Sequence, residues 1–111
     1  MIHYGIIGGT FDPIHYGHLI CAERVREFLN MDYIYFIPSG TPPHKNYKGM
    51  GSTVDRYNMV QQAISSNPYF KISDIEAKRE GYSYTIDTIN QLSSLLGDHI
   101  RLLNWFIVSI V

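Results

Sequence analysis

Four apolar, β-favouring runs alternate along this chain with three segments of helical periodicity, and this alternation limits the fold more than any other feature. The runs cover residues 1–7, 33–37, 70–72 and 103–111. Between them, apolar residues recur every three or four positions in the segments 16–29, 53–66 and 86–96, as on one face of a helix. Continuously apolar strands joined by helices are typical of a parallel sheet. We therefore predict an α/β fold with helices on both faces of a parallel sheet, made of three βα units and a further strand.

The size of the chain fits one domain. It has 111 residues, of which 45% are hydrophobic and 17% charged, a composition that can build a core. We find no internal repeat and no linker-like segment, so we expect a single domain over residues 1–111. Right-handed crossovers would bring the strand-to-helix turns together at the carboxyl edge of the sheet, where ligands of open α/β sheets bind.

The net charge and the cysteine content exclude some classes of binding partner and some cellular compartments. The net charge is −1 and the isoelectric point is near 6.5, which gives no general attraction to nucleic acid or to an anionic membrane. The single cysteine, Cys21, excludes an internal disulfide and fits a reducing compartment. Its position in the helical pattern predicts a buried, inert thiol. The N-terminus lacks the features of a signal peptide, so we expect a cytoplasmic protein.

The first strand-to-helix turn, residues 8–18, carries the residues best suited to chemistry. It contains neither the G-x-G-x-x-G pattern of dinucleotide sites nor the G-x-x-x-x-G-K-S/T pattern of P-loops. Gly8 and Gly9 have no side chain and allow the backbone to approach a ligand closely. His15 and His18 are three residues apart at the start of a helix, so both can face one side. Two imidazoles beside free helical N–H groups are suited to binding phosphate.

Two other interpretations of these histidines remain open at this point. They could belong to a metal site, but such a site needs three or four protein ligands, and only Asp12 lies nearby. They could also be ordinary surface histidines at a helix start. Similarly, Asp12 could act only as a helix cap or hold the turn. A lysine of this chain, taken in isolation, would most often be simply exposed to solvent.

The wider sequence context favours the phosphate interpretation. Residues 9–18 match the signature G-T-F-D-P-x-H-x-G-H without a gap, and the chain therefore resembles the nucleotidylyltransferase superfamily. This resemblance implies a Rossmann-like sheet, in agreement with the order of elements above. It implies that His15 and His18 contact the phosphates of ATP and stabilise the transition state. It also implies that the nucleotide site is lined by the turn residues Gly8, Gly9, Thr10 and Phe11.

Two later segments narrow the resemblance to the nicotinate-nucleotide adenylyltransferase family. Residues 37–45, which read I-P-S-G-T-P-P-H-K, are similar to the substrate loop of that family, and Lys45 is then the implied phosphate contact. Residues 73–88 are similar to the stretch that holds the nicotinate end of the substrate. There the backbone around Tyr84 and Thr85 would meet the pyridine carboxylate, beside a second helix N-terminus. The resemblance covers about residues 1–96.

The resemblance implies an enzyme that transfers the adenylyl group of ATP to nicotinate mononucleotide, in the biosynthesis of NAD. Its catalytic residues would be His15, His18 and Lys45, and its substrate contacts would be Lys45, Tyr84 and Thr85. Mg²⁺ would arrive with ATP, without a dedicated protein cage. The alternatives are a nucleotide-binding remnant without catalysis, a phosphopantetheine adenylyltransferase, and, more distantly, a redox dinucleotide domain.

The C-terminal part departs from the family. Relatives continue with a G-A-D-type turn, a tryptophan that packs on the pyridine ring and a second phosphate-binding motif, whereas residues 102–108 match none of these. Trp105 has no counterpart in the pattern. We therefore expect the N-terminal portion of the family fold, truncated at its C-terminal end. The apolar edge strand of such a sheet would favour association into a homo-oligomer and would leave nucleotide binding weak.

Overall fold

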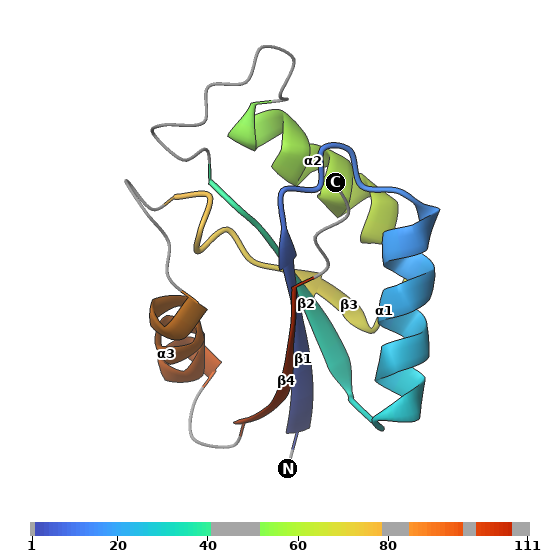
Figure 1. Ribbon diagram of the computed structural model, residues 1–111, viewed down its shortest axis with the longest axis vertical. Coiled ribbons are helices and arrows are strands. Elements are labelled where there is room, and N and C mark those ends of the chain that lie inside the picture. The colour runs from blue at the N-terminus through green and yellow to red at the C-terminus, as the bar shows by residue number, and fades with distance from the viewer. Residues whose placement is uncertain (1, 41–51, 79–84, 97–99, 108–111) are drawn as a thin grey trace.

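Strands and helices alternate throughout the chain, as the sequence predicts. The computed structural model describes residues 2–40, 52–78, 85–96 and 100–107 (Figure 1). The elements are, in order, β1 (Ile2–Gly9), α1 (Tyr16–Phe28), β2 (Tyr33–Pro38), α2 (Thr53–Ile64), β3 (Phe70–Ile72), α3 (Thr85–Leu96) and β4 (Ile100–Ile107).

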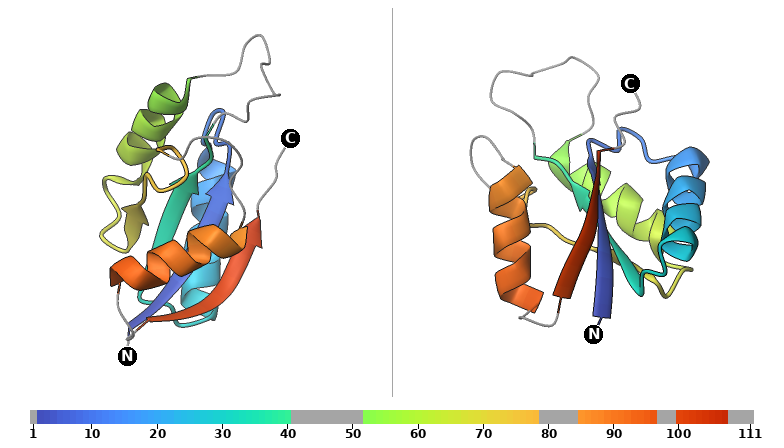
Figure 2. Two further views of the ribbon diagram at one scale, coloured as in Figure 1. Left: turned by 90° about the vertical axis from the view of Figure 1, so that its left-hand side faces the viewer. Right: turned by 60° about the horizontal axis from the view of Figure 1, so that its bottom comes forward.

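The four strands form one parallel sheet in the order β3-β2-β1-β4. The first strand is therefore central and pairs with β2 on one side and with β4 on the other. Helices α1 and α2 cover one face of the sheet, and α3 covers the opposite face (Figure 2). This arrangement confirms the predicted Rossmann-like α/β fold. The chain builds outward from β1 in both directions, so a topological switch point lies beside the carboxyl end of β1.

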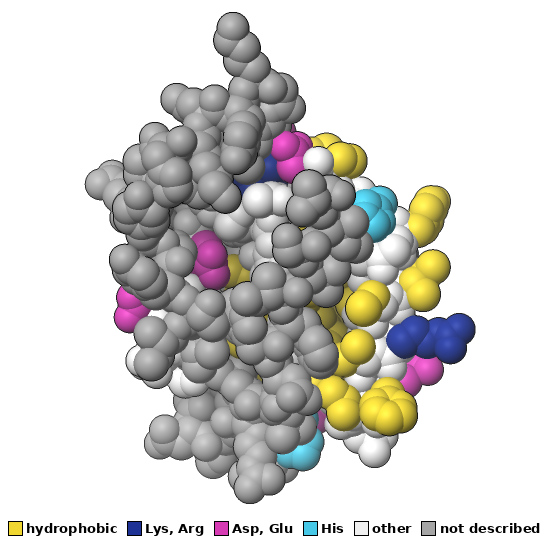
Figure 3. All heavy atoms as spheres, viewed as in Figure 1, with side chains coloured by type: hydrophobic (Ala, Val, Ile, Leu, Met, Phe, Trp, Pro, Cys, Tyr) yellow, Lys and Arg dark blue, Asp and Glu magenta, His cyan; other side chains and the backbone are white. Residues whose placement is uncertain are grey.

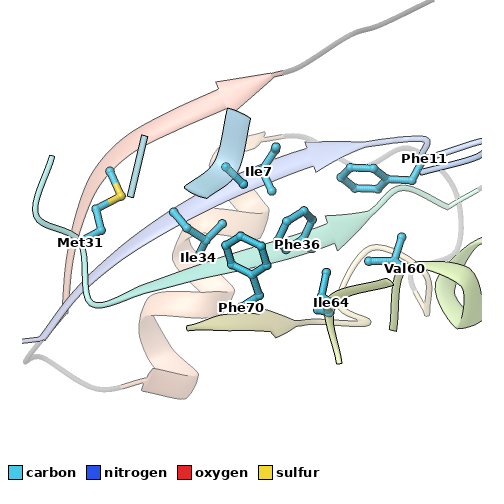
Figure 4. Close-up of a cluster of buried hydrophobic side chains, with 9 residues drawn as sticks. Ile7, Phe11, Met31, Ile34, Phe36, Val60, Ile64 and Phe70 are labelled. Carbon is cyan, nitrogen blue, oxygen red and sulfur yellow. The ribbon is translucent and has the colours of Figure 1, made fainter. Parts of the chain in front are cut away.

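The larger hydrophobic core lies between the sheet and the helices α1 and α2 (Figure 4). Phe36 of β2 is fully buried at its centre, and its ring centroid lies 5.0 Å from that of Phe70 and 5.9 Å from that of Phe11. Phe11 follows β1 at the end of the sheet where Val60 of α2 also packs (Figure 4). The turn that carries the candidate residues is thus anchored directly in the core.

A smaller core lies on the opposite face, under α3. It contains Ile6 of β1, Ile37 of β2, Ile75 and Leu92. Because successive strand residues point to opposite faces, Ile6 and its neighbour Ile7 are buried in different cores. This explains why the strands read as continuous apolar runs.

The structure differs from the sequence-based expectations at three points. Strand β1 continues through Gly9, where we expected a turn from Gly8 onward, and β4 begins at Ile100, three residues earlier than expected. Both differences arise because strand length follows pairing: Gly9 pairs with Pro38 of β2, and Ile100 pairs with Ile2. The third prediction was wrong. Cys21 is exposed, because the buried stripe of α1 passes through the neighbouring Ala22.

The outer surface of α1 carries apolar side chains (Figure 3). Tyr16, Ile20 and Phe28 are all more than half exposed there. Among the described residues, no helix is long and apolar enough to cross a membrane.

Candidate functional site

The candidate site begins where β1 ends, at the carboxyl edge of the sheet. Gly8 and Gly9 are the last two residues of the strand, and Thr10 begins the turn. The backbone of Phe11 adopts a positive φ of 48°, an uncommon conformation for a residue with a side chain. Its ring is only 2% exposed, and the core contacts described above hold it in place. The structure thus gives Phe11 a packing role, and its predicted contact with a nucleotide stays a prediction.

His15 and His18 lie side by side at the N-terminus of α1. Their ring centroids are 3.9 Å apart, and the planes are inclined by 37°. The prediction that the two side chains face the same side is therefore confirmed. His15 is exposed, whereas His18 is only 4% exposed and meets the ring of Phe11 edge-on at 5.2 Å.

The same two imidazoles cap the helix. Nδ1 of His15 accepts a hydrogen bond from the backbone N–H of Gly17 at 3.0 Å, and Nδ1 of His18 accepts one from the backbone N–H of His15, also at 3.0 Å. This reciprocal pattern is a capping box, in which two histidines replace the usual Ser/Thr and Glu/Gln pair. Because each Nδ1 is an acceptor, the proton of each neutral ring is on Nε2. Both rings are therefore set as Nε2–H donors.

Electrostatics at this end of α1 favours an anion. The first turn of the helix contains no acidic residue, so the positive end of the helix dipole is not neutralised there. Burial, followed by the charge of His15, lowers the pKa of His18 below its ordinary value. His18 is thus held neutral near physiological pH, as a hydrogen-bond donor that a nearby phosphate would engage through Nε2.

Sequence reasoning missed a buried arginine beneath this turn. Arg56, in the first turns of α2, is fully buried, and its Nη1 donates to the backbone carbonyls of Thr10 at 2.9 Å and Ser39 at 2.8 Å. The sequence did contain a signal, because Arg56 lies four residues before Val60 and eight before Ile64. All three therefore fall on the buried face of α2.

The residues predicted to bind the second substrate are only partly described. Lys45 and Tyr84 lie outside the described residues. Thr85 is the first residue of α3, as the prediction of a helix N-terminus requires. Another polar contact fixes this helix, since the buried Thr88 donates through Oγ1 to Glu76 Oε2 at 3.1 Å, a link that we did not predict. The structure therefore brings His15 and His18 together and leaves the roles of Lys45, Tyr84 and Thr85 as predictions.

No set of three or more histidine, cysteine or acidic side chains in the described part of the chain is arranged to hold a metal ion. In addition, the capping bonds occupy Nδ1 of both His15 and His18. In each ring, Nε2 is the nitrogen that the capping bonds leave uninvolved.

Comparison with known proteins assigns the family. Residues 6–108 match the family described as cytidylyltransferase-like. The chain belongs to that family. Its fold also agrees with that of a solved structure, nicotinic acid mononucleotide adenylyltransferase of Plasmodium falciparum complexed with NaAD, at a TM-score of 0.68 and 20% sequence identity. That match covers 96% of this chain and 50% of the solved chain, and at this identity it supports the fold alone.

Curated relatives within the family are closer in sequence. A probable nicotinate-nucleotide adenylyltransferase of Desulfitobacterium hafniense is 50% identical over 95 residues, which are 86% of this chain and 46% of the relative. Another, from Dehalococcoides mccartyi, is 53% identical over 98 residues, which are 88% of this chain and 48% of the relative. The chain thus spans about half the length of the curated relatives it matches.

Proposed function

We propose that this chain is an adenylyltransferase that acts on ATP and nicotinate mononucleotide. The observation that carries the proposal is the pair of adjacent imidazoles, whose ring centroids are 3.9 Å apart, at the N-terminus of α1. The first turn of this helix has no acidic residue, and it lies beside the switch point of the sheet. The two relatives that are about 50% identical to this chain are both named as probable nicotinate-nucleotide adenylyltransferases, which supports the same activity and the same acceptor.

In the proposed reaction, a phosphate oxygen of nicotinate mononucleotide attacks the α-phosphorus of ATP. A new bond forms between that oxygen and the α-phosphorus, the bond to the bridging oxygen breaks, and pyrophosphate leaves with the electron pair. The product is nicotinate adenine dinucleotide. Such a transfer requires alignment of the two reactants and stabilisation of charge on the phosphate oxygens, and it requires no protein nucleophile.

The described residues can supply that stabilisation. His15 and His18 would donate from Nε2 to the phosphates of ATP, and the amides at the start of α1 add to the positive field. Because the capping bonds already orient both rings, little reorganisation is needed when the substrate binds. ATP would enter as its Mg²⁺ complex, with the ion held mainly by the phosphates and water. Lys45, Tyr84 and Thr85 remain the proposed contacts of the acceptor nucleotide.

A second candidate function is that of a domain that binds nucleotide without transferring it. Pyrophosphate release separates the two functions. If the chain binds Mg-ATP in calorimetry but releases no pyrophosphate with nicotinate mononucleotide, the binding function is supported and the transferase proposal fails.

The histidine role is tested with His18→Ala, and Ile20→Ala serves as the control because it removes an exposed side chain from the same helix. We expect His18→Ala to weaken the transfer on the order of a hundredfold, the typical cost of one preorganised donor, and Ile20→Ala to leave it unchanged. Circular dichroism of both variants checks that the fold is retained. Equal turnover in the two variants would remove His18 from the mechanism.

A further inference from the structure

A buried arginine joins the ends of the two central strands. Arg56 is fully buried, although arginine is almost never fully buried unless its charge is paired or hydrogen-bonded. It lies on the buried face of α2, one turn before Val60, at a position where an apolar side chain would be expected. A charged group at this position must therefore make contacts that an apolar side chain could not make.

Those contacts are with the first residue after each strand. Nη1 donates to the carbonyl of Thr10, directly after β1, and to the carbonyl of Ser39, directly after β2. Nη2 donates to Oγ1 of Thr53 at 3.2 Å, which fixes the guanidinium to its own helix. The backbone N–H of Ser39 in turn donates to the carbonyl of Gly9 at 2.8 Å. One side chain thus connects α2 to both strand ends at the point where they separate into their loops.

Arginine suits this position because its planar guanidinium presents several donors in a fixed geometry. Lysine offers only a single flexible centre, so it cannot hold two carbonyls and a hydroxyl in the same relative positions. Burial lowers the pKa of Arg56, while the negative charge of Asp12 acts in the opposite direction. The guanidinium nevertheless stays protonated, because arginine keeps its charge in proteins.

We propose that Arg56 is a positioning residue that fixes the turn carrying His15 and His18 against the carboxyl end of β2. The inference rests on the proposed transferase function. Thr10 begins the turn that leads to His15 and His18, and Ser39 directly follows β2. By holding both carbonyls, Arg56 keeps the two imidazoles in place to donate to the phosphates of ATP. Because it is fully buried, it acts through the two turns and touches neither substrate.

The test compares Arg56→Lys with Val60→Ala. Val60 is also fully buried on the same face of α2, but it packs in the hydrophobic core. The control therefore lowers stability without releasing the strand ends. If Arg56→Lys does not fold, Arg56→Met is used, since it fills a similar volume without a charge. The free energy of unfolding of each variant is first measured with denaturant, so that the variants are compared at matched stability.

The first measurement is hydrogen exchange at the backbone amide of Ser39. We expect Arg56→Lys to accelerate exchange there by about tenfold more than at amides in the middle of β2. The carbonyl of Ser39 loses its charge-assisted hydrogen bond, so the strand end that holds the Ser39 amide against Gly9 opens more often. Val60→Ala should accelerate exchange at both places equally. An equal effect of Arg56→Lys at Ser39 and in mid-strand would show that the arginine does not hold the strand ends, and would overturn the proposal.

The second measurement is turnover with Mg-ATP and nicotinate mononucleotide. A misplacement of about 1 Å typically costs on the order of a hundredfold in rate, so Arg56→Lys should lower kcat on that scale with KM for ATP changed far less. A kcat no lower than that of Val60→Ala at matched stability would overturn the positioning role. If the parent chain releases no pyrophosphate, the transferase proposal fails by itself, and the Ser39 amide still decides whether Arg56 joins the two strand ends.

Discussion

The close fit between Gly17 and the ring of His15 can be tested by adding a single methyl group. A Cβ at residue 17 would lie 2.8 Å from Cε1 and 2.9 Å from Nδ1 of His15, too close for atoms that are not bonded. The imidazole must therefore turn away in the variant Gly17→Ala. It then loses the hydrogen bond that its Nδ1 accepts from the backbone N–H of residue 17.

Two opposing effects set the expected change in stability. Loss of an N-cap side-chain interaction costs about 1 kcal/mol. Replacement of glycine by alanine within a helix contributes about 0.5–1 kcal/mol in the favourable direction. In the parent chain, Gly17→Ala should therefore leave the free energy of unfolding almost unchanged. In a His15→Ala background there is no ring to displace, so the same substitution should stabilise by the full propensity gain.

A double-mutant cycle measures this difference. The free energy of unfolding is determined with denaturant for the parent, both single variants and the double variant, and we expect a coupling of about 1 kcal/mol between positions 15 and 17. Calorimetry with Mg-ATP should in addition show weaker binding for Gly17→Ala than for the parent. If Gly17→Ala stabilises the chain equally in both backgrounds, the ring is not displaced and the capping argument is refuted.

The remaining predictions concern pH and the core. Because burial lowers the pKa of His18 from 6.5, the unfolded chain takes up that proton first, and the stability that the neutral ring contributes should be lost as the pH falls below 6.5. His18→Asn, which keeps an acceptor for the capping bond, should flatten the dependence of unfolding free energy on pH, and parallel curves would contradict this cause. Phe36→Ala should destabilise the fold by about 3–5 kcal/mol, as large cavities do, whereas the exposed Ile20→Ala should cost little. Similar unfolding midpoints for these two variants would mean that the core does not depend on Phe36.

The parts of the fold that local pattern controls were predictable. The apolar runs predicted the four strands that the structure describes, and the three- to four-residue spacing predicted the three helices that it describes. The proximity of His15 and His18 also followed from spacing, because residues three apart on a helix share a side. These predictions needed no knowledge of what lies against each element.

The features that depend on distant partners were not predictable in the same way. The burial of Arg56 depends on two carbonyls, at Thr10 and Ser39, that only the assembled sheet brings together. The spacing to Val60 and Ile64 places Arg56 on the buried face of α2, but it does not show which groups accept its hydrogen bonds. The exposed Cys21 shows a second limit of prediction from spacing. A step of one position along a helix turns the side chain from the buried face to the solvent, as from Ala22 to Cys21.

The central place of β1 affects how the protein is made. Ile2 pairs with Ile100, so β1 gains its second neighbour only after residues 100–107 have been synthesised. Until then, one edge of β1 is open, and closing it requires contact across almost the whole described length of the chain, which slows folding. A nascent chain that stalls before β4 therefore exposes this strand to other polypeptides.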